Sequence, residues 1–536
     1  MRARSTAFTV SLLVSLTAWG QPYRAAVQES LWSGSRNAAG LRSLEYIDTP
    51  FRDYLDAANR DGYGGPRRYS LAELYGSYGD GGFKPLHVGS SVWKAGAAAS
   101  SLTDLPKTTL AGDFRFEQQE GQEMRGSMFI HPGYYPVDVV EFTPGSKTLQ
   151  TYGLSGRIAH EVSDRWVVGA DLGFTSSNYA KRKDIRHTNY ALDLGIAPGI
   201  LYRWHLGDDL DLDFGASYRF RKTSESIDAE QVGSATADSY FAFLDKGMRY
   251  GTYQVWDGAG IHLAEAGVGC FPVRETTHGG ALQASLSSSL FLEAGYDVSR
   301  GEVGEKGYTW FRFPGRQFHT DFAFRTPELD VIKVTYRLHF DTDGQTLDET
   351  VLDKVTSGGV TTPEIYGSNT VFRRRTASLR HSVEVDGRNG YAWLRQARLE
   401  YGRSRHREYS TLMYPYTDTL GLDTHRLSLS GRFRHRTSRE YGLALLGQWS
   451  HVHEQGLEAL PSDAAPVGEP FRLTADWIRK REYMSAGRFG LQASVRFYLP
   501  FPGLYTEVSG SWLHGFRLEY LGTDRWEAGL KLGYAF

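Results

Sequence analysis

Residues 525–536 of the chain read RWEAGLKLGYAF. From Trp526 onward every even position is apolar or small, whereas the odd positions hold Glu527, Lys531 and small residues. Because side chains of a β-strand alternate between its two faces, this stretch predicts a strand with one apolar and one polar face. Such a strand suits a wall between lipid and water, and the stretch ends on the aromatic residue Phe536.

The closing strands of bacterial outer-membrane β-barrels resemble this stretch, including its terminal aromatic residue. The resemblance implies that outer-membrane lipid surrounds the strand and that the outer-membrane assembly machinery recognises its end at Phe536. We therefore expect a protein of the outer membrane of a Gram-negative bacterium.

The N-terminus has the pattern of a secretory signal peptide. A basic start precedes an apolar run from Phe8 to Trp19, which is too short to span a bilayer as a helix. Small residues before Gln21 predict cleavage there, so residues 1–20 form the expected signal peptide. Residues 21–69 are too few and too polar for a separate domain. We expect them to form either a plug in the barrel or a periplasmic leader.

The composition favours a β-protein with tight turns and aromatic girdles. The 536 residues include 60 Gly, 32 Tyr, 28 Phe and 12 Trp. The formal net charge of −2 gives no sign of a nucleic-acid partner. The single cysteine, Cys270, excludes an internal disulfide and a cysteine-based zinc site, and we expect no cofactor. No apolar stretch after the leader is long enough for a membrane-spanning helix.

Alternation between apolar and polar residues recurs over residues 70–536, in runs of ten or more residues. Strands of soluble β-proteins usually have about five or six residues, so these runs favour tilted membrane strands. The expected strands are 70–79, 88–102, 108–119, 147–161, 165–175, 190–205, 210–221, 259–271, 281–299, 308–325, 330–342, 370–385, 390–408, 422–436, 440–455, 483–499, 503–521 and 526–536.

The expected connections alternate between short turns and longer loops. The longer ones lie near 120–146, 176–186, 223–258, 343–369, 409–421 and 456–482. This asymmetry is typical of short periplasmic turns and long extracellular loops. The sequence therefore predicts an all-β fold, a transmembrane antiparallel up-and-down β-barrel of about 18 strands (range 14 to 18) over residues 70–536. A barrel of this size must hold water or a plug in its lumen.

Charged residues recur on the face of the strands opposite the apolar one. Arg or Lys facing lipid at the bilayer midplane costs about 2–4 kcal/mol, so we expect the charged residues to line the lumen. The lumen-lining candidates are Asp211, Asp213, Arg219, Arg221, Arg432, Arg434, Arg496, Arg517, Glu519 and Glu527. Their mixed signs favour a salt-bridged, hydrated wall. A sharper hypothesis is an arginine ladder that guides anionic solutes, formed by Arg219, Arg221, Arg432, Arg434 and Arg436.

The long loops are rich in aromatic residues. The candidates for ligand binding in these loops are Tyr134, Tyr135, Trp256, Tyr414 and Tyr416. Aromatic rings beside acids and amides suit stacking against sugars or peptides. The alternative is an outer aromatic belt with ordinary loop packing, which we favour.

The histidines of the sequence are the candidates for catalysis or metal binding. His451 and His453 share one face of an expected strand, but no third ligand is marked, so we expect polar rim residues and no metal site. His381 and His514 lie on apolar faces without a serine in evident register. No nucleophile elbow is found, so we predict no catalytic residue and no enzyme.

Two stretches resemble known families. Residues 69–83, YSLAELYGSYGDGGF, followed by WKAGA at 93–97, resemble the start of an uncharacterised outer-membrane β-barrel family of Bacteroidota. That resemblance covers about residues 30–536 and implies the barrel fold, without any function or active residue. Residues 37–41, NAAGL, are similar to the Asn-x-Ala-Gly-Leu element at the N-terminal hatch of long-chain fatty-acid transporters.

Three hypotheses for the function follow. The favoured one is a channel or transporter that passes small solutes through a lumen of mixed charge. The second is a structural or partner-binding barrel of a surface or secretion assembly, which a lumen filled by residues 21–69 and the 223–258 loop would favour. The third is a membrane-embedded hydrolase, which needs a serine or an acid close to His451, His381 or His514.

Overall fold

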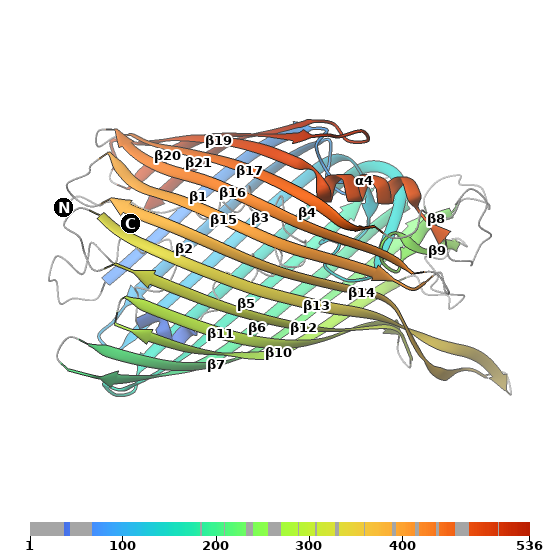
Figure 1. Cartoon of the computed structure of the whole chain (residues 1–536), viewed down its shortest axis with the longest axis horizontal. Coiled ribbons are helices and arrows are strands. Elements are labelled where there is room, and N and C mark those ends of the chain that lie inside the picture. The colour runs from blue at the N-terminus through green and yellow to red at the C-terminus, as the bar shows by residue number, and fades with distance from the viewer. Residues whose placement is uncertain are drawn as a thin grey trace.

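The computed structural model describes residues 37–42, 67–182, 185–207, 210–231, 240–255, 270–287, 289–305, 308–326, 332–357, 360–387, 393–412, 417–435, 439–455, 471–501 and 503–535. Within these residues, 18 antiparallel strands form a closed β-barrel (Figure 1). The predicted fold class and strand number are therefore confirmed.

The wall of the barrel is built from strands that each pair with both neighbours. The wall strands are β1 (Arg67–Gly81), β2 (Ser91–Asp104), β3 (Thr108–Ser127), β4 (Asp138–Glu161), β5 (Trp166–Lys181), β6 (Ile185–His205), β7 (Asp211–Gln231), β10 (Cys270–Leu286), β11 (Leu290–Glu305), β12 (Tyr308–Arg325), β13 (Ile332–Ser357), β14 (Val360–Gly387), β15 (Leu394–Ser410), β16 (Asp418–His435), β17 (Arg439–Gln455), β19 (Gly487–Tyr498), β20 (Leu504–Phe516) and β21 (Asp524–Ala535).

The strand with which the sequence ends closes the barrel. β21 pairs with β20 on one side and with β1 on the other, from Leu71↔Ala535 to Gly81↔Arg525. Closure leaves no free edge in the wall, as a sheet in lipid requires. Phe536 itself lies outside the described residues.

The remaining elements lie outside this wall. They are the strands β8 (Tyr240–Asp245), β9 (Tyr250–Val255) and β18 (Phe471–Arg472), the 3-10 helix η1 (Ala38–Arg42) and the helix α4 (Thr474–Ser485). In the described part of the chain, neither helix is long and apolar enough to cross a membrane.

The two ends of the barrel differ in their connections. β21 ends at one end, marked C in Figure 1, where connections such as 105–107 and 162–165 are short. We call this the short-turn end. The longer connections and α4 lie at the opposite end, which we call the long-loop end.

The apolar side chains of the alternating pattern face outward. On β21, 59% of Leu530 is exposed, against 9% of Arg525. On β5, 52% of Leu172 is exposed, against 9% of its neighbour Asp171. Soluble proteins rarely expose contiguous apolar patches beyond a few hundred Å², so a wall that is apolar on its outside faces hydrocarbon.

One of the predicted strands spans two observed strands. The predicted strand 281–299 is in fact β10 and β11, which meet in a tight turn around Ser287. Even-numbered residues face outward on both strands, for example Leu282 and Leu292, so the alternation runs through the turn unbroken. Of the predicted strand 259–271, residues 259–269 lie outside the described residues and only its end belongs to β10. Residues 270–305 thus form two strands, β10 and β11, where the strands 259–271 and 281–299 were predicted, so the strand number agrees with the prediction.

Other boundaries also differ from the prediction. The predicted loop 343–369 continues β13 and β14 as a hairpin paired as far as Ser357↔Val360, which extends beyond the barrel (Figure 1). Residues 483–485 belong to α4 and not to the following strand. β20 ends at Phe516, so residues 517–521 form a connection. The hairpin was missed because its strands leave the membrane without a change in backbone conformation.

A charge on the lipid face of the closing strand should destabilise the barrel. We expect Leu530→Arg to lower the free energy of unfolding by about 2–4 kcal/mol, because residue 530 faces hydrocarbon. Glu527→Arg, on the inner face of the same strand, should change it much less. Urea unfolding in lipid vesicles measures both values, and equal effects would contradict the assignment of the two faces.

Candidate functional site

Several connections at the long-loop end fold into the barrel. We define the cap as residues 128–137, residues 240–255 (β8, β9 and the turn between them) and residues 471–485 (β18 and α4). The first four residues of β4 pair with β8, β8 pairs with β9, and β9 pairs with β18. The strands of the cap therefore branch from the start of β4, and α4 lies beside them at the end of the barrel opposite β21's end (Figure 1).

A hydrophobic core joins the cap to the inner face of the wall. Phe129 and Tyr135 of the cap are buried, and their rings lie 5.9 Å from Phe271 of β10 and 5.7 Å from Phe313 of β12, between ring centroids. The same cluster includes inward-facing residues of four further wall strands, namely Val303, Leu347, Val371 and Leu420. The cap thus occupies the interior of the barrel at the long-loop end.

Ion pairs connect the cap to the wall on several sides. Arg472 of β18 lies 2.7 Å from Asp418 of β16, between Nη1 and Oδ2. The other two pairs are Lys246–Glu349 at 2.6 Å and Lys480–Glu408 at 3.8 Å. Each pair joins a cationic side chain of the cap region to an acid of the wall, so charge complementarity fixes the position of the cap.

Arg472 is the most extensively held of these cations. Its guanidinium lies 4.6 Å from the ring centroids of both Tyr250 and Trp477. The hydroxyl of Tyr250 also donates a hydrogen bond of 3.1 Å to Asp418. Arg472 therefore ties β9, β18, α4 and the wall together through one side chain.

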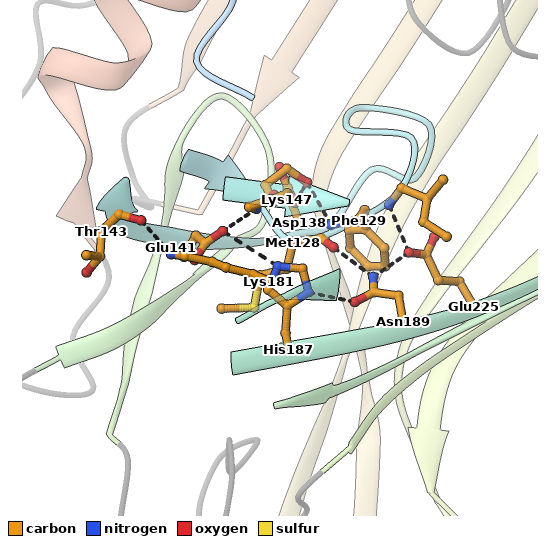
Figure 2. A network of polar contacts seen from close by, with 12 residues as sticks. Met128, Phe129, Asp138, Glu141, Thr143, Lys147, Lys181, His187, Asn189 and Glu225 are labelled. Atoms are coloured by element: carbon orange, nitrogen blue, oxygen red, sulfur yellow. Dashed lines mark hydrogen bonds and ion pairs between the residues drawn. The ribbon is translucent and has the colours of Figure 1, made fainter. Parts of the chain in front are cut away.

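A buried charged network lies where the cap meets β4, β5 and β6 (Figure 2). The carboxylate of Glu141 forms ion pairs with Lys147 and, at 2.5 Å, with Lys181. Both ammonium groups are buried, and each also donates to a backbone carbonyl, Lys147 to Ser127 at 3.0 Å and Lys181 to Thr143 at 2.5 Å. Burial of so many charges is tolerated only because each has a partner.

The network continues to the cap loop through β6 and β7. Nδ1 of His187 lies 2.9 Å from Oδ1 of Asn189, and the amide of Asn189 donates to Met128 O and to Glu225, both at 2.7 Å. The backbone N–H of Ile130 donates to the same Glu225 carboxylate at 2.9 Å. The start of the cap loop is thus bound by side chains of the wall, as Figure 2 shows.

A second segment lies against the inner wall near the short-turn end. Asn37 donates hydrogen bonds to the carbonyls of Ile200 at 2.9 Å and Ala216 at 3.2 Å, and η1 follows it directly. The wall is indented here by Gly169 of β5 and Gly199 of β6, which face each other in the sheet. A Cβ at Gly169 would lie 2.2 Å from the backbone N of Ala39, so glycine is required for this contact.

Two glycine substitutions on one strand test this packing of residues 37–42 against the wall. We expect Gly169→Ala to displace residues 37–42 from the wall, because the backbone of Ala39 leaves no space for a methyl group. Gly173→Ala, on the same strand, meets nothing within 4 Å and should leave the segment in place. Crosslinking to the wall from a probe on residue 40, where a Cβ would meet only the side chain of Gln283 at 3.5 Å, measures the displacement. Equal crosslinking in both variants would contradict the packing of residues 37–42 against Gly169.

The lumen-lining candidates fall into two groups. Arg219, Arg221, Arg432 and Arg496 lie inside the wall and pair with acids, namely Asp297 at 3.2 Å, Asp193 at 2.5 Å, Glu440 at 3.7 Å and Glu507 at 2.6 Å. Asp213 pairs with Arg203 at 3.2 Å, Asp211 with His205 at 2.6 Å, and Arg434 lies 5.6 Å from the Tyr498 ring. Glu527 lies on the inner face of β21.

Arg517 and Glu519 lie exposed in the connection after β20, not on the wall strand where alternation had placed them.

The arginines therefore do not form an unpaired ladder in the described part of the wall. Arg436 of that hypothesis lies outside the described residues. The pairing agrees with a salt-bridged wall, in which acid and base of neighbouring strands brace the barrel. Whether these residues contact a solute stays a prediction.

The loop aromatics are only partly described. Tyr134 and Tyr135 are buried in the core of the cap, with their ring centroids 4.9 Å apart, and do not form an exposed platform. Trp256, Tyr414 and Tyr416 lie outside the described residues. A role in ligand binding stays a prediction for all five.

The histidines of the hydrolase hypothesis lie on the outer face. His381 is hydrogen-bonded to Tyr336 at 2.8 Å and stacks on Tyr401, within a row of aromatic rings that continues over β14 to β17. His514 lies 2.8 Å from Asp524, so an acid does meet this histidine. Its other described contacts are the rings of Trp512 and Phe516. His451 is exposed on β17.

The residues that hold the cap were missed in the sequence. Glu141 and Lys181 fall in the predicted loops 120–146 and 176–186, where no periodicity marks which side chains are buried, and Lys147 is the first residue of the predicted strand 147–161. Only the lengths of the connections 120–146, 223–258 and 456–482 could have indicated that they hold folded structure.

The fold and the capped interior define a transmembrane β-barrel with an internal cap at its long-loop end. The chain belongs to the family described as "Family of unknown function (DUF6850)", whose model matches residues 61–536. No curated protein matches the chain. The resemblances to a Bacteroidota family and to fatty-acid transporters stay predictions.

Several solved structures are similar in fold. The alcaligin outer-membrane receptor FauA from Bordetella pertussis has 9% identity and a TM-score of 0.42, with 87% of this chain and 76% of that chain covered. The ferric preacinetobactin receptor BauA from Acinetobacter baumannii has 8% identity and a TM-score of 0.40, with 88% and 80% covered.

Proposed function

We propose that the protein is an outer-membrane transporter whose lumen passes small polar solutes when the cap moves. The observation that carries this proposal is that the wall is complete without the cap. β7 pairs directly with β10, and β17 pairs directly with β19, so the insertions that carry β8, β9, β18 and α4 leave and rejoin the wall between neighbouring strands. Moving these elements breaks no hydrogen bond between those wall strands.

The nature of the contacts between cap and wall also supports movement. Apart from its apolar core and the short ladder between the start of β4 and β8, the cap is held by ion pairs such as Arg472–Asp418 and Lys246–Glu349 and by side-chain hydrogen bonds. Charged groups regain hydration when such pairs open, which offsets much of the lost attraction. With the short turns at the periplasmic side, as in other outer-membrane barrels, the cap closes the outer entrance.

The wall indicates the class of solute. An 18-stranded barrel leaves an interior too wide for wall side chains to fill, and its inner face carries ion-paired arginines and acids. A lumen with this lining suits small polar molecules better than apolar ones.

Liposome swelling tests the transport of solutes. The test variant replaces the connection 232–269 with a short glycine–serine linker, which removes β8 and β9 and keeps the β7–β10 pair. We expect vesicles with this variant to swell in small sugars much faster than vesicles with the native protein. Equal, negligible swelling of both, with the barrel folded, would contradict the transporter proposal.

A second candidate function rests on the hairpin of β13 and β14. This hairpin projects beyond the barrel and exposes Val351, Val355, Ile365 and Tyr366. Exposed apolar side chains on a projecting strand pair suit a partner protein at the cell surface. Replacing the exposed Val351, Val355 and Ile365 with serine should then abolish site-specific crosslinking from residue 366 without changing solute flux. Unchanged crosslinking in this variant would contradict this role.

A further inference from the structure

A cluster of metal-ligating side chains lies on the inner face of β11 and β12. Glu293 of β11 is directly opposite Asp321 of β12 in the sheet, and Gly295 is directly opposite His319. One oxygen or nitrogen atom of each of Glu293, His319 and Asp321 lies within 4.8 Å of the others. Two carboxylates and one imidazole, all of which can bind divalent transition metals, thus converge from two neighbouring strands.

Gly295 makes this convergence possible. A Cβ at residue 295 would lie 2.2 Å from Cε1 of His319, so the imidazole lies over the glycine and any other residue would displace it. The glycine therefore sets the direction in which His319 points, toward Glu293.

The spacing of the atoms fits two ligands of one ion better than a hydrogen bond. Nε2 of His319 lies 3.6 Å from Oε1 of Glu293. An N–H···O hydrogen bond normally measures about 2.7–3.2 Å. Two ligands at about 2.0–2.2 Å from a tetrahedral zinc ion are separated by about 3.4 Å. The observed distance needs only a small adjustment to match that separation.

The charge on Glu293 has no cationic partner of its own in the described residues except this histidine. Only 3% of Glu293 is exposed, and its Oε2 atom accepts no hydrogen bond. Neighbouring acids of the wall are compensated differently, since Asp297 pairs with Arg219 at 3.2 Å. A buried carboxylate oxygen without a donor is costly, and a bound cation removes that cost.

The third ligand is oriented by further side chains. Oδ1 of Asp321 lies 2.7 Å from Nδ1 of His339, whose Nε2 lies 3.4 Å from Asp341. Asp341 in turn accepts a hydrogen bond from Ser378. Carboxylates and histidines that bind metals are commonly held by such outer partners.

We infer that Glu293, His319 and Asp321 form a binding site for one divalent transition-metal ion on the lumen wall. The mixed nitrogen and oxygen donors suit Zn²⁺ and related ions, whereas Ca²⁺ and Mg²⁺ prefer oxygen ligands alone. Three protein ligands leave room for water or an incoming ligand at the fourth position. This site is separate from the cap and stands independently of the transporter proposal.

Metal binding by the purified full chain, without a histidine tag and after chelator treatment, tests the site. We expect titration with Zn²⁺ to show one saturable site per chain and Co²⁺ to give visible absorption bands that Zn²⁺ displaces. His319→Ala and Glu293→Gln should abolish this binding. His339→Ala, which removes only an outer partner, should weaken it by about 10- to 100-fold.

A second histidine–acid pair of the wall provides the matched control. Nε2 of His406 lies 3.1 Å from Glu408, but the next charged group there is Lys480 and not a second acid. His406→Ala should therefore keep the affinity of the native protein. Absence of a saturable site, equal binding by the His319→Ala variant, or equal loss in the His406→Ala variant would overturn the inference. Heat-modified electrophoretic mobility checks that each variant is folded.

Discussion

Replacing Glu141 with alanine is expected to loosen the cap by about 3–5 kcal/mol, the usual cost of removing one member of a buried ion pair. The substitution leaves the ammonium groups of Lys147 and Lys181 buried next to each other without their shared carboxylate. Both lysines also hold backbone carbonyls at the edge of the cap, so loss of their order spreads to residues 127–143.

Hydrogen exchange of residues 127–147 measures this effect, because exchange rates report the free energy of local opening. Glu117→Ala is the control, since its partner Arg115 is largely exposed and such pairs contribute about 0–1 kcal/mol. Equal exchange in the native protein and the Glu141→Ala variant would show that this network does not hold the cap.

The same network predicts a dependence on pH. Burial by itself raises the pKa of Glu141, but the ammonium of Lys147, with His187 and Lys181, outweighs it and lowers this pKa from 4.5 to about 2. Because the pKa is lower in the folded protein, the stabilisation is complete above about pH 4.5 and is lost as the pH falls toward 2. Protection of the cap should follow this course in the native protein, and this component should be absent from the Glu141→Ala variant.

Arg472→Ala is expected to have the second large effect, an increase of about a hundredfold in the rate at which trypsin cleaves α4. The substitution leaves Asp418 buried without its cation and removes the stacking on Tyr250 and Trp477, which costs about 3 kcal/mol or more. Each 1.4 kcal/mol changes the open population about tenfold when opening precedes cleavage. Trypsin has its targets in α4 at Arg479, Lys480 and Arg481.

Two further variants sharpen this test. Arg472→Lys should keep part of the protection, because lysine retains the charge but not the planar stacking. Arg403→Ala removes an exposed ion pair with Asp423 and should leave cleavage of α4 unchanged. A similar increase in cleavage for Arg403→Ala would indicate that any lost ion pair loosens the barrel.

The wall of the barrel could be predicted from the sequence because its pattern is local. Every second side chain of a wall strand faces lipid, so Leu530 and Leu172 reveal their environment without knowledge of any partner strand. The closing pair of β1 and β21 followed from the terminal strand in the same way. The prediction failed at Ser287, between β10 and β11, because apolar and polar residues keep alternating through the turn and the sequence therefore does not mark it.

The cap could not be predicted because its contacts join residues far apart in the sequence. Arg374 of β14 donates to the carbonyls of Gly133 and Tyr134, and Arg472 stacks on Tyr250. Neither contact leaves a periodic signal. Buried lysines such as Lys147 and Lys181 also contradict the usual preference of lysine for the surface, so only the fold reveals them.

The conductance of single molecules in a planar lipid bilayer tests the central claim, that the cap closes the lumen. The comparison is between the native protein and a variant that combines Glu141→Ala with Arg472→Ala, which releases the cap from two sides and leaves the wall intact. We predict that the native protein is closed most of the time, whereas the variant shows large conductance steps with a much higher open probability. A native protein that is permanently open, or a folded variant that stays silent, would contradict the account.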